Sequence, residues 1–371
     1  MRQPFLIRPF NKRSIIMNNI KHKVTNNLPL TFEELMLLYD SDLDTLQKLA
    51  EEKRRILNGN KVFYNQNFHI EPSNVCIHRC RFCSYRRNHE YEQSAWSMSI
   101  DDIRKYCYDK YEKGMTEVHI VGGIHPDKDF EYYETIIGLV RSILPPKVAI
   151  KAYSAIEIDD MCIKSELSAK EILIRLKKKG LSALPGGGAE IFDSEIREKI
   201  CPDKASAKRW LEIHGIAHRL GISTNATMLF GHIENREQRV RHILKIRSQQ
   251  EITKGFNAFI PLKFSSVNND LSYLEEIKEE EVLRTFAIVR LALHNIPHIK
   301  AYWPMLGKEL CIKTLLFGAD DIDGTINNST KIYSMAGAQE QRPALCADEL
   351  KKMAQTVGFD AKERDSFYNI I

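Results

Sequence analysis

The sequence lacks the run of about 18 apolar residues that a membrane-spanning helix needs, so we expect no membrane-spanning segment. It also lacks a long basic block with interleaved aromatic residues, and its net charge of +5 is small for 371 residues. Nucleic-acid binding is therefore not indicated. Internal repeats and low-complexity segments are absent as well. We expect a cytoplasmic protein that binds neither nucleic acid nor a membrane.

Cysteine is scarce, with 8 residues in 371, and only three of them are closely spaced. The other five are scattered along the chain: Cys107, Cys162, Cys201, Cys311 and Cys346. This distribution is not that of a disulfide framework and indicates a reducing compartment. Because free cysteine behaves as a small hydrophobic residue that is often buried, we expect these five to fill the core.

Residues 1–30 mix basic residues with apolar stretches that are too short for a signal-peptide core. We expect a disordered or poorly ordered N-terminal extension here, with Met17 as an alternative first residue. Residues 31–60 show helical patterns that begin at Thr31 with Glu33 and Glu34 in the first turn. These residues form a predicted helical preface to the remainder of the chain, residues 61–371.

Short β-rich runs alternate with amphipathic helical stretches after residue 60. We expect eight strands, at 63–70, 117–121, 148–152, 183–184, 223–229, 258–264, 298–303 and 318–322. Several intervening helical stretches end at a glycine, the residue that most easily adopts a left-handed C-terminal cap. The alternation predicts parallel βα units that close into an α/β (β/α)8 barrel, for which a chain of this length suffices. An open doubly wound sheet is the alternative.

Cys76, Cys80 and Cys83 form a Cys-x3-Cys-x2-Cys triplet directly after the first predicted strand. Cysteine sulfur is the usual protein ligand of a [4Fe–4S] cluster, and three ligands leave one iron open to a substrate or cofactor. A structural zinc site would need a fourth protein ligand, which His78 or His89 could supply. A glycine pair, Gly122-Gly123, ends the next predicted strand, and a zinc module does not require that order. The pattern therefore favours the cluster.

Glycine-rich turns follow two of the predicted strands. Gly122 and Gly123 have no side chain to obstruct a ligand, and the same holds for three consecutive glycines at 186–188. Glu190, just after the second turn, is a candidate acceptor of hydrogen bonds from a ligand. Arg209 is a candidate partner for a carboxylate because its planar guanidinium pairs with both oxygens. In a barrel, such groups gather at the C-terminal ends of the strands.

Other polar residues also fall at predicted strand ends. His125, His232 and His298 are candidate proton donors, and Lys300, with Tyr302 and Trp303, could receive an aromatic carboxylate. Of these residues, His125, His232 and Lys300 are the candidate catalytic residues. The acids at 320, 321 and 323 are loop residues that we expect to cap a helix or to accept backbone hydrogen bonds.

The triplet, with Phe82 before its third cysteine, resembles the signature of the radical S-adenosylmethionine (SAM) enzymes. The resemblance implies a [4Fe–4S] cluster held by Cys76, Cys80 and Cys83, and SAM as a co-substrate that chelates the open iron. It also implies a reducing electron donor such as flavodoxin or ferredoxin. The residues that it implies as SAM contacts are Phe82, Gly122, Gly123, Glu190, Arg209, Met228 and Glu234.

Longer segments resemble the aminodeoxyfutalosine synthases, namely residues 119–126, 184–192, 224–234 and 295–303. Segments 298–303, 319–325 and 331–338 favour these synthases over two sister families, the cyclic dehypoxanthine futalosine synthases and the deazaflavin-forming synthases. Residues 327–330 depart from the pattern, because they are neutral where acidic residues are expected.

This resemblance implies an enzyme of menaquinone biosynthesis by the futalosine route. The 5′-deoxyadenosyl radical from SAM would add to 3-[(1-carboxyvinyl)oxy]benzoate, with rearrangement and decarboxylation, to give 6-amino-6-deoxyfutalosine. The alternatives are the reactions of the two sister families and, from another class, a zinc- or cluster-binding regulatory protein without turnover.

Overall fold

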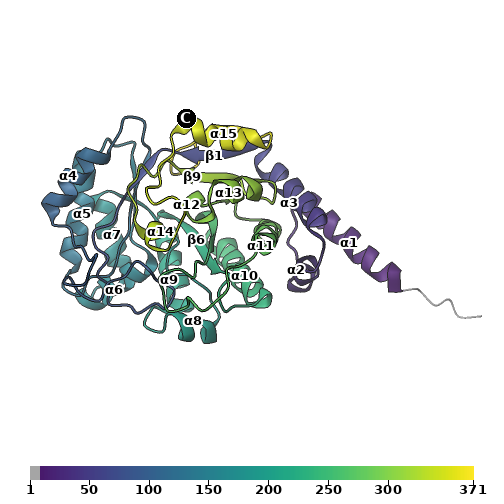
Figure 1. Cartoon of the computed structure of the whole chain (residues 1–371), viewed down its shortest axis with the longest axis horizontal. Helices are drawn as coiled ribbons and strands as arrows, with labels where there is room; N and C mark the ends of the chain where they lie inside the picture. The colour runs from purple at the N-terminus through teal and green to yellow at the C-terminus, as the bar shows by residue number, and fades with distance from the viewer. Residues whose placement is uncertain (1–8) are drawn as a thin grey trace, which may run out of the picture.

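The computed structural model describes residues 9–371 and is built around a seven-stranded parallel sheet (Figure 1). Its strands follow one another in chain order: β2 (Asn67–Ile70), β3 (Glu117–Ile120), β4 (Ala149–Ala152), β5 (Leu181–Leu184), β6 (Ser223–Phe230), β7 (Phe256–Lys263) and β8 (His298–Ile299). Because every pairing is parallel, the C-terminal ends of all seven strands lie at one edge of the sheet.

A smaller parallel sheet joins the two ends of the large one. It has the order β10 (Asp360–Glu363), β1 (Lys61–Asn65) and β9 (Asp321–Gly324). Gln66 alone separates β1 from β2, and a single parallel bridge pairs Lys300, just after β8, with Asp321 of β9. The predicted α/β barrel is therefore confirmed, with β9 in the place of the eighth strand.

The first predicted strand, 63–70, is in fact two strands. The chain changes partner at Gln66 because Asn67 bonds to the residues that follow β9 instead of continuing the ladder. Its backbone N–H donates to Thr325 Oγ1 at 3.0 Å, and its side-chain oxygen accepts from the Ile326 N–H at 2.8 Å. The eighth strand correspondingly spans 321–324, three residues later than the predicted 318–322 at its start.

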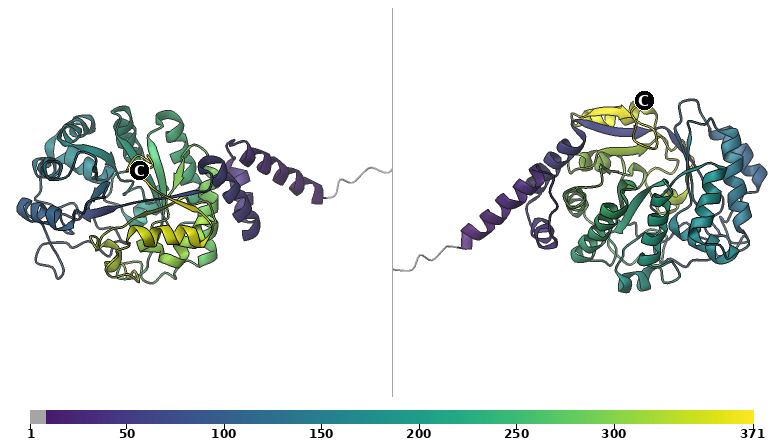
Figure 2. Two further views of the ribbon diagram at one scale, coloured as in Figure 1. Left: turned by 90° about the horizontal axis from the view of Figure 1, so that it is seen from above. Right: turned by 180° about the vertical axis from the view of Figure 1, so that it is seen from behind.

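Helices cover the outer face of the strands (Figure 2). The helices after β2 are α4 (Ile100–Lys110), α5 (Phe130–Ile143), α6 (Ala155–Ser165), α7 (Ala169–Lys179), α8 (Ser194–Ile200), α9 (Ala207–Arg219), α10 (Arg236–Thr253), α11 (Glu279–Ala292), α12 (Trp303–Leu306), α13 (Lys308–Leu315), α14 (Ile332–Met335) and α15 (Ala347–Thr356). Of these, α14 does not lie on the outer face, because its Ile332 and Tyr333 line the interior of the barrel. Four of them begin with reciprocal capping boxes, at Ser99, Ser154, Ser168 and Asn235, which satisfy free amides of the first turn. Within residues 9–371 no helix has both the length and the apolar character needed to cross a bilayer.

Three helices precede the sheets: α1 (Pro9–Thr25), α2 (Phe32–Tyr39) and α3 (Leu43–Asn58). Helix α1 projects away from the barrel in Figure 1. Poor order was predicted for residues 1–30, and this prediction is wrong over 9–25. Helix formation there has a physical reason, since Ile20 and Val24 are fully buried and Lys23 forms an ion pair with Glu34 of α2 at 2.8 Å. Residues 1–8 lie outside the described residues.

The inner faces of the strands are unusually polar. Side chains alternate between the two faces of a strand, and in β3 the apolar Val118 and Ile120 are fully buried while Glu117 and His119 line an interior cavity. Apolar layers fill the interior of an ordinary (β/α)8 barrel. The polar interior here therefore marks the place to look for a site.

Candidate active site

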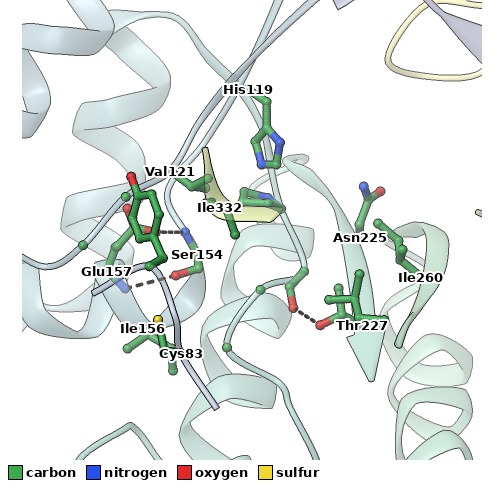
Figure 3. Close-up of a pocket in the computed structure, with 18 of the residues that line it drawn as sticks. Cys83, His119, Val121, Ser154, Ile156, Glu157, Asn225, Thr227, Ile260 and Ile332 are labelled. Atoms are coloured by element: carbon green, nitrogen blue, oxygen red, sulfur yellow. Dashed lines mark hydrogen bonds between the residues drawn. The ribbon is translucent and has the colours of Figure 1, made fainter. Parts of the chain in front are cut away.

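A cavity of about 260 Å³ runs from the loops after the strands down into the barrel. Its outer part, here called the thiol end, is lined by Cys76, Cys80, Phe82, Cys83, Gly122, Gly123, Ser154, Glu157, Gly186, Gly187, Gly188 and Lys204. Its inner part, the polar floor, is lined by Asn67, Glu117, His119, Lys151, Asn225, Thr227, Lys300 and Asp323. Cys83 and His119 lie at opposite ends of the labelled residues in Figure 3. Ile260 and Leu262 of β7 supply part of the apolar lining of this cavity.

The cysteine triplet lies on the loop between β2 and α4. The Cys76 N–H donates to the Arg87 carbonyl at 2.9 Å, the Cys83 N–H donates to the Cys80 carbonyl at 3.1 Å, and the Arg81 N–H donates to the Ile200 carbonyl at 2.9 Å. These bonds hold all three thiols against the cavity. Burial raises the pKa of the Cys76 and Cys80 thiols, so a bound cation is needed to make these residues thiolates near neutral pH.

This donor set fits a cluster better than a single metal ion. Within residues 9–371, no three His, Cys, Asp or Glu side chains are grouped as one metal ion would require. A cluster has no such requirement, because each thiolate binds a different iron. Of the two histidines considered for zinc, His78 lines the cavity, whereas His89 is exposed and does not.

Gly122 and Gly123 line the cavity as predicted, but the close approach that they allow is to protein. A Cβ on Gly122 would lie 2.7 Å from the Ser73 carbonyl oxygen, and one on Gly123 would overlap the Val75 carbonyl oxygen. The Gly123 N–H also donates to the Ser73 carbonyl at 2.6 Å. The glycine pair therefore allows close packing against the backbone that leads into Cys76. The sequence predicted only contact with a ligand for these two glycines.

The three glycines at 186–188 differ in what they allow. A Cβ on Gly186 would lie 2.8 Å from the Ala226 carbonyl carbon, so this glycine allows the loop to pack against β6. Gly188 has φ of 85°, which favours glycine. A Cβ on Gly187 would come no closer than 3.7 Å to Ser154, so this residue alone has space around it on the cavity side.

Glu157 is a cavity residue that was missed at the level of sequence. Its side chain accepts from the Ser154 N–H at 2.6 Å in the capping box of α6 (Figure 3). Burial raises the pKa of Glu157 to about 7, although hydrogen bonds from Ser154 and Gly122 lower it. The available signal was the Ser-x-x-Glu spacing right after a predicted strand, which locates a carboxylate at the strand end.

Glu190 reaches the thiol end through Lys204, a second missed residue. The Lys204 Nζ lies 2.6 Å from Glu190 Oε1 and 5.2 Å from the centre of the Phe82 ring. Burial by itself lowers the pKa of Lys204, but the neighbouring Cys80 and Glu190 raise it well above its ordinary value. The thiol end thus contains a buried ammonium group that can meet an anionic ligand.

Two predicted SAM contacts, Arg209 and Met228, do not line the cavity. The Arg209 guanidinium lies 2.6 Å from Asp159 on α6 and 3.2 Å from Glu212 on α9, so neighbouring acids already occupy it. Met228 is fully buried in β6 between Thr227 and Leu229. Because side chains alternate along a strand, Met228 faces the opposite side from Thr227, which does line the cavity.

A third predicted contact, Glu234, is used by its own loop. It accepts from the Gly231 and His232 amides at 2.6 and 2.9 Å and pairs with Arg239 at 2.6 Å. Burial raises the pKa of Glu234, but His232 and Arg239 outweigh that effect and lower it to about 2. Glu234 therefore shapes the turn between β6 and α10 and does not line the cavity.

Of the three candidate catalytic residues, only Lys300 lines the cavity. His125 is buried elsewhere, with Nε2 3.0 Å from Glu90 and Nδ1 accepting from the Asp127 N–H at 3.1 Å. His232 is buried with its Nδ1 3.0 Å from Glu234. Both histidines stabilise loops near the strand ends. This location explains why their positions in the sequence suggested a catalytic role.

The polar floor combines ion pairs with neutral imidazole rings. Lys151 lies 2.6 Å from Glu117, and Lys300 is paired with Asp323. The rings of His69 and His119, register partners on β2 and β3, are 4.7 Å apart. Burial lowers the pKa of His69 to about 4 and that of His119 well below its ordinary value, so both are neutral near pH 7. Among residues 9–371, the His119 Nε2 is buried without a partner.

Three thiols at the C-terminal edge of a parallel barrel, one buried and two partly exposed, face a polar cavity, and these are the features of a radical SAM enzyme. Residues 70–246 match the Radical SAM superfamily, and residues 253–371 match the CofH/MqnC C-terminal region. Among solved structures, methylornithine synthase has a TM-score of 0.74 at 17% identity, covering 92% of this chain and 97% of its own. The hydrogenase maturase HydG has a TM-score of 0.72 at 16% identity, covering 96% and 80%. These two structures support the fold.

Comparison with curated relatives shows which radical SAM enzymes this chain resembles. The chain is 39% identical to the aminodeoxyfutalosine synthase of Thermus thermophilus over 94% of both chains, and 36% identical to that of Streptomyces coelicolor over 96% and 94%. It is 36% identical to the 5-amino-6-(D-ribitylamino)uracil–L-tyrosine 4-hydroxyphenyl transferase of Archaeoglobus fulgidus over 87% and 93%. The chain belongs to the radical SAM family that contains the aminodeoxyfutalosine synthases. Its cofactors are those of the superfamily, a [4Fe–4S] cluster and SAM.

Proposed function

We propose that this enzyme joins the 5′-deoxyadenosyl group of SAM to 3-[(1-carboxyvinyl)oxy]benzoate and releases 6-amino-6-deoxyfutalosine, a step of menaquinone biosynthesis. One observation carries the choice of acceptor. The segments that favour the synthases over their sister families supply Lys300, Tyr302, Asp323 and Tyr333 to the cavity. The presence of these residues in the cavity supports an acceptor site there.

The thiol end is the proposed site of the cofactors. Cys76, Cys80 and Cys83 ligate the cluster, and Phe82 packs at the adenine of SAM. Bound together, the cluster and SAM supply a 5′-deoxyadenosyl radical. Lys204, held by Glu190, offers an ammonium group to the methionine carboxylate, and Glu157 offers a carboxylate to ammonium or hydroxyl donors.

The polar floor and the residues beside it are the proposed acceptor site. The substrate has an aromatic ring and two carboxylates. Lys151 and Lys300 line the cavity, and each has three N–H donors, so each can bond a carboxylate while paired with Glu117 or Asp323. The His119 Nε2 provides an unused polar atom, and the Tyr302 and Tyr333 rings, 4.7 Å apart, provide aromatic surface. Holding the vinyl carbon close to the adenosyl carbon lowers the barrier to addition, and the enclosed barrel keeps the radical from water.

The proposal includes an external electron donor such as flavodoxin or ferredoxin, because cleavage of SAM consumes one electron. It also includes a cytoplasmic location, which suits the reduced state that the cluster requires. The ether bond would break as the adenosyl-bearing carbon moves to the ring and the ether oxygen becomes a ketone. The carboxylate would leave as carbon dioxide or bicarbonate, with return of the one electron that SAM cleavage used.

Anaerobic reconstitution followed by product analysis tests the proposal. The enzyme is incubated with SAM, a chemical reductant and 3-[(1-carboxyvinyl)oxy]benzoate, and the products are identified by mass spectrometry. We expect the mass of the adenosine–acceptor adduct after loss of one carboxylate. Turnover of a futalosine derivative instead, with free 5′-deoxyadenosine, would indicate the cyclase. Turnover of tyrosine with a ribitylaminouracil would indicate the transferase, and no reductant-dependent SAM cleavage would indicate a non-catalytic protein.

A further inference from the structure

The segment from Thr325 to Tyr333, here called the crossing segment, connects β9 to α14 and includes the neutral residues 327–330 that sequence comparison left unexplained. Its last two residues, Ile332 and Tyr333, line the cavity. Ile332 lies between His119 and Ser154 in the view of Figure 3. The crossing segment thus forms part of the cavity wall, and its position matters for whatever binds there.

The backbone of the crossing segment is strained. Ile326, Asn327 and Asn328 have φ of 61°, 50° and 46°, three successive residues other than glycine in the left-handed region. For a β-branched residue such as isoleucine this conformation is a rare exception. Strain of this kind persists only where the surroundings hold the chain in place, and it gathers at functional sites.

Strand β2 and helix α4 both hold the crossing segment through hydrogen bonds. Asn67 bonds to Thr325 and Ile326 as described above, and the His69 N–H donates to Ser329 Oγ at 2.7 Å. From α4, Lys110 Nζ donates to the Asn327 carbonyl at 3.1 Å. These contacts fix the first half of the crossing segment, up to Ser329.

Glu71 holds the second half. This residue directly follows β2 and is only 6% exposed. Its carboxylate accepts from the Thr330 hydroxyl and from the Lys331 N–H at 3.0 Å. Burial raises the pKa of Glu71 to about 7, against the lowering effect of those hydrogen bonds. Both bonded residues come immediately before the two that line the cavity, so the carboxylate sets where the chain turns inward.

Tyr333 is the residue whose place depends on this anchor. Its ring lies 4.7 Å from the Tyr302 ring at an angle of 50°, and both rings line the cavity near Lys300. Tyr302 is the N-cap residue of α12, three residues after β8, and within residues 9–371 its hydroxyl is buried without a partner. Movement of the crossing segment would therefore shift the Tyr333 ring relative to the Tyr302 ring and change the distance between them.

We propose that Glu71 is a positioning residue for the acceptor: by fixing Thr330 and Lys331 it places Tyr333, which with Tyr302 forms the wall against which the aromatic ring of the acceptor lies. This inference rests on the proposed function. A well-placed acceptor intercepts the adenosyl group, whereas a poorly placed one allows SAM to be cleaved without addition. Glu71 therefore determines what fraction of the cleaved SAM is converted to product.

The first test is Glu71→Gln, which keeps the size of the side chain but replaces one accepting oxygen by a donating amide. We expect the ratio of adduct to free 5′-deoxyadenosine to fall about tenfold, as for loss of one charge-assisted hydrogen bond. The KM for the acceptor should rise while the KM for SAM and the iron content stay unchanged. An unchanged ratio in Glu71→Gln, with product formed by the wild type, would overturn this inference and leave the proposed function intact.

A double-variant comparison separates positioning from a general structural role. If Glu71 acts through Tyr333, the variant carrying both Glu71→Gln and Tyr333→Ala should give the ratio of Tyr333→Ala alone. Effects that multiply would overturn the inference. Thr330→Val removes one donor to Glu71 and should lower the ratio in the same direction, which keeps the test decisive if Glu71→Gln does not fold.

The matched control is Glu134→Gln, a half-buried acid on α5 that pairs with Arg175 of α7 at 2.7 Å, outside the barrel. We expect its ratio to equal that of the wild type. Absence of any adduct from the wild-type enzyme would instead overturn the proposed function and this inference together.

Discussion

At the scale of the residue, the three clustered cysteines differ from the scattered ones in what surrounds them. Cys76, Cys80 and Cys83 face the cavity, while four of the other five cysteines are buried in the protein and Cys346 is exposed at the start of α15. Burial raises the pKa of the Cys76 and Cys80 thiols, so these two are stable as neutral groups until a metal binds.

We therefore predict that Cys76→Ala, Cys80→Ala or Cys83→Ala each prevents assembly of a complete [4Fe–4S] cluster. Iron content, visible absorbance and the electron spin resonance signal after anaerobic reconstitution measure this directly. Cys346→Ser is the control and should hold a normal cluster. A full cluster and full activity in all three alanine variants would show that the ligands are elsewhere.

Lys204 gives a second prediction at this scale. Replacing it by glutamine removes the buried ammonium at the thiol end, and we expect SAM to bind about ten- to hundredfold more weakly, the effect of losing one charge-assisted hydrogen bond. Isothermal titration of the reconstituted enzyme measures the affinity, with the exposed Lys208→Gln as the matched control. Unchanged affinity in Lys204→Gln, with a clear loss in Arg209→Gln, would restore the original assignment of Arg209.

At the scale of the element, the loops after β2 and β3 form one unit, because the glycine pair of one loop supports the cysteine loop of the other. A methyl group on Gly123 has no space beside the Val75 carbonyl. Gly123→Ala should push the backbone before Cys76 outward and lower the iron content sharply. Gly138→Ala on α5, where a Cβ would lie 3.5 Å from the Lys179 side chain, is the control and should bind iron normally. Normal iron in both variants would contradict this role for Gly123.

Much at this scale follows from local patterns. Alternating β-rich and helical runs predicted the strands β3 to β8 to within a few residues, and the triplet was correctly placed after the strand that leads into it. The inward-facing residues were harder to find. Glu117, His119 and Lys151 lie within strands and belong to no motif. The only signal in the sequence is that they are polar residues in otherwise apolar strands.

The predicted SAM contacts that lie outside the cavity share a physical feature. Arg209 and Glu234 have the charge that a SAM contact needs, but Asp159 and Arg239, each on a helix, already pair with them. Partner choice of this kind depends on how helices pack, which a single sequence does not specify. Lys204 was missed for the converse reason, since nothing near it in the chain indicates that it reaches Phe82 and Glu190.

At the scale of the whole molecule, buried histidines make stability depend on pH. Burial lowers the pKa of His69 to about 4 and of His242 to about 3, and lowers those of His119 and His214 as well. Below pH 6.5 these residues bind protons in the unfolded chain but not in the native one, so acid favours unfolding. Two glutamates, Glu71 and Glu157, act in the opposite direction because burial raises their pKa to about 7.

Histidines whose pKa is lowered by burial, which also include His218 (to about 4) and His294, outnumber the two glutamates and leave a net excess of protons on the unfolded chain between about pH 5 and 6.5. We predict that the free energy of unfolding of the cluster-free protein falls as pH drops through this window, by up to about 1.4 kcal/mol per pH unit for each uncompensated proton. Urea titrations at several pH values measure it. Stability that stays constant or increases toward pH 5 would refute the prediction.

His242 provides the control for this pH dependence. Its Nδ1 accepts from the Phe192 N–H at 3.1 Å, and its Nε2 donates to the Thr227 carbonyl at 2.9 Å, so the ring must remain neutral to make both bonds. Glutamine can make the same two bonds without titrating. His242→Gln should therefore reduce the slope of stability against pH by about 1.4 kcal/mol per unit.

The central claim is that the adenosyl group of SAM becomes part of the product. The most direct measurement uses SAM labelled with carbon-13 in its ribose, incubated anaerobically with the reduced enzyme and 3-[(1-carboxyvinyl)oxy]benzoate. We expect the label in 6-amino-6-deoxyfutalosine, with one labelled ribose for each acceptor consumed. Label found only in free 5′-deoxyadenosine, with the enolpyruvyl ether intact, would contradict it.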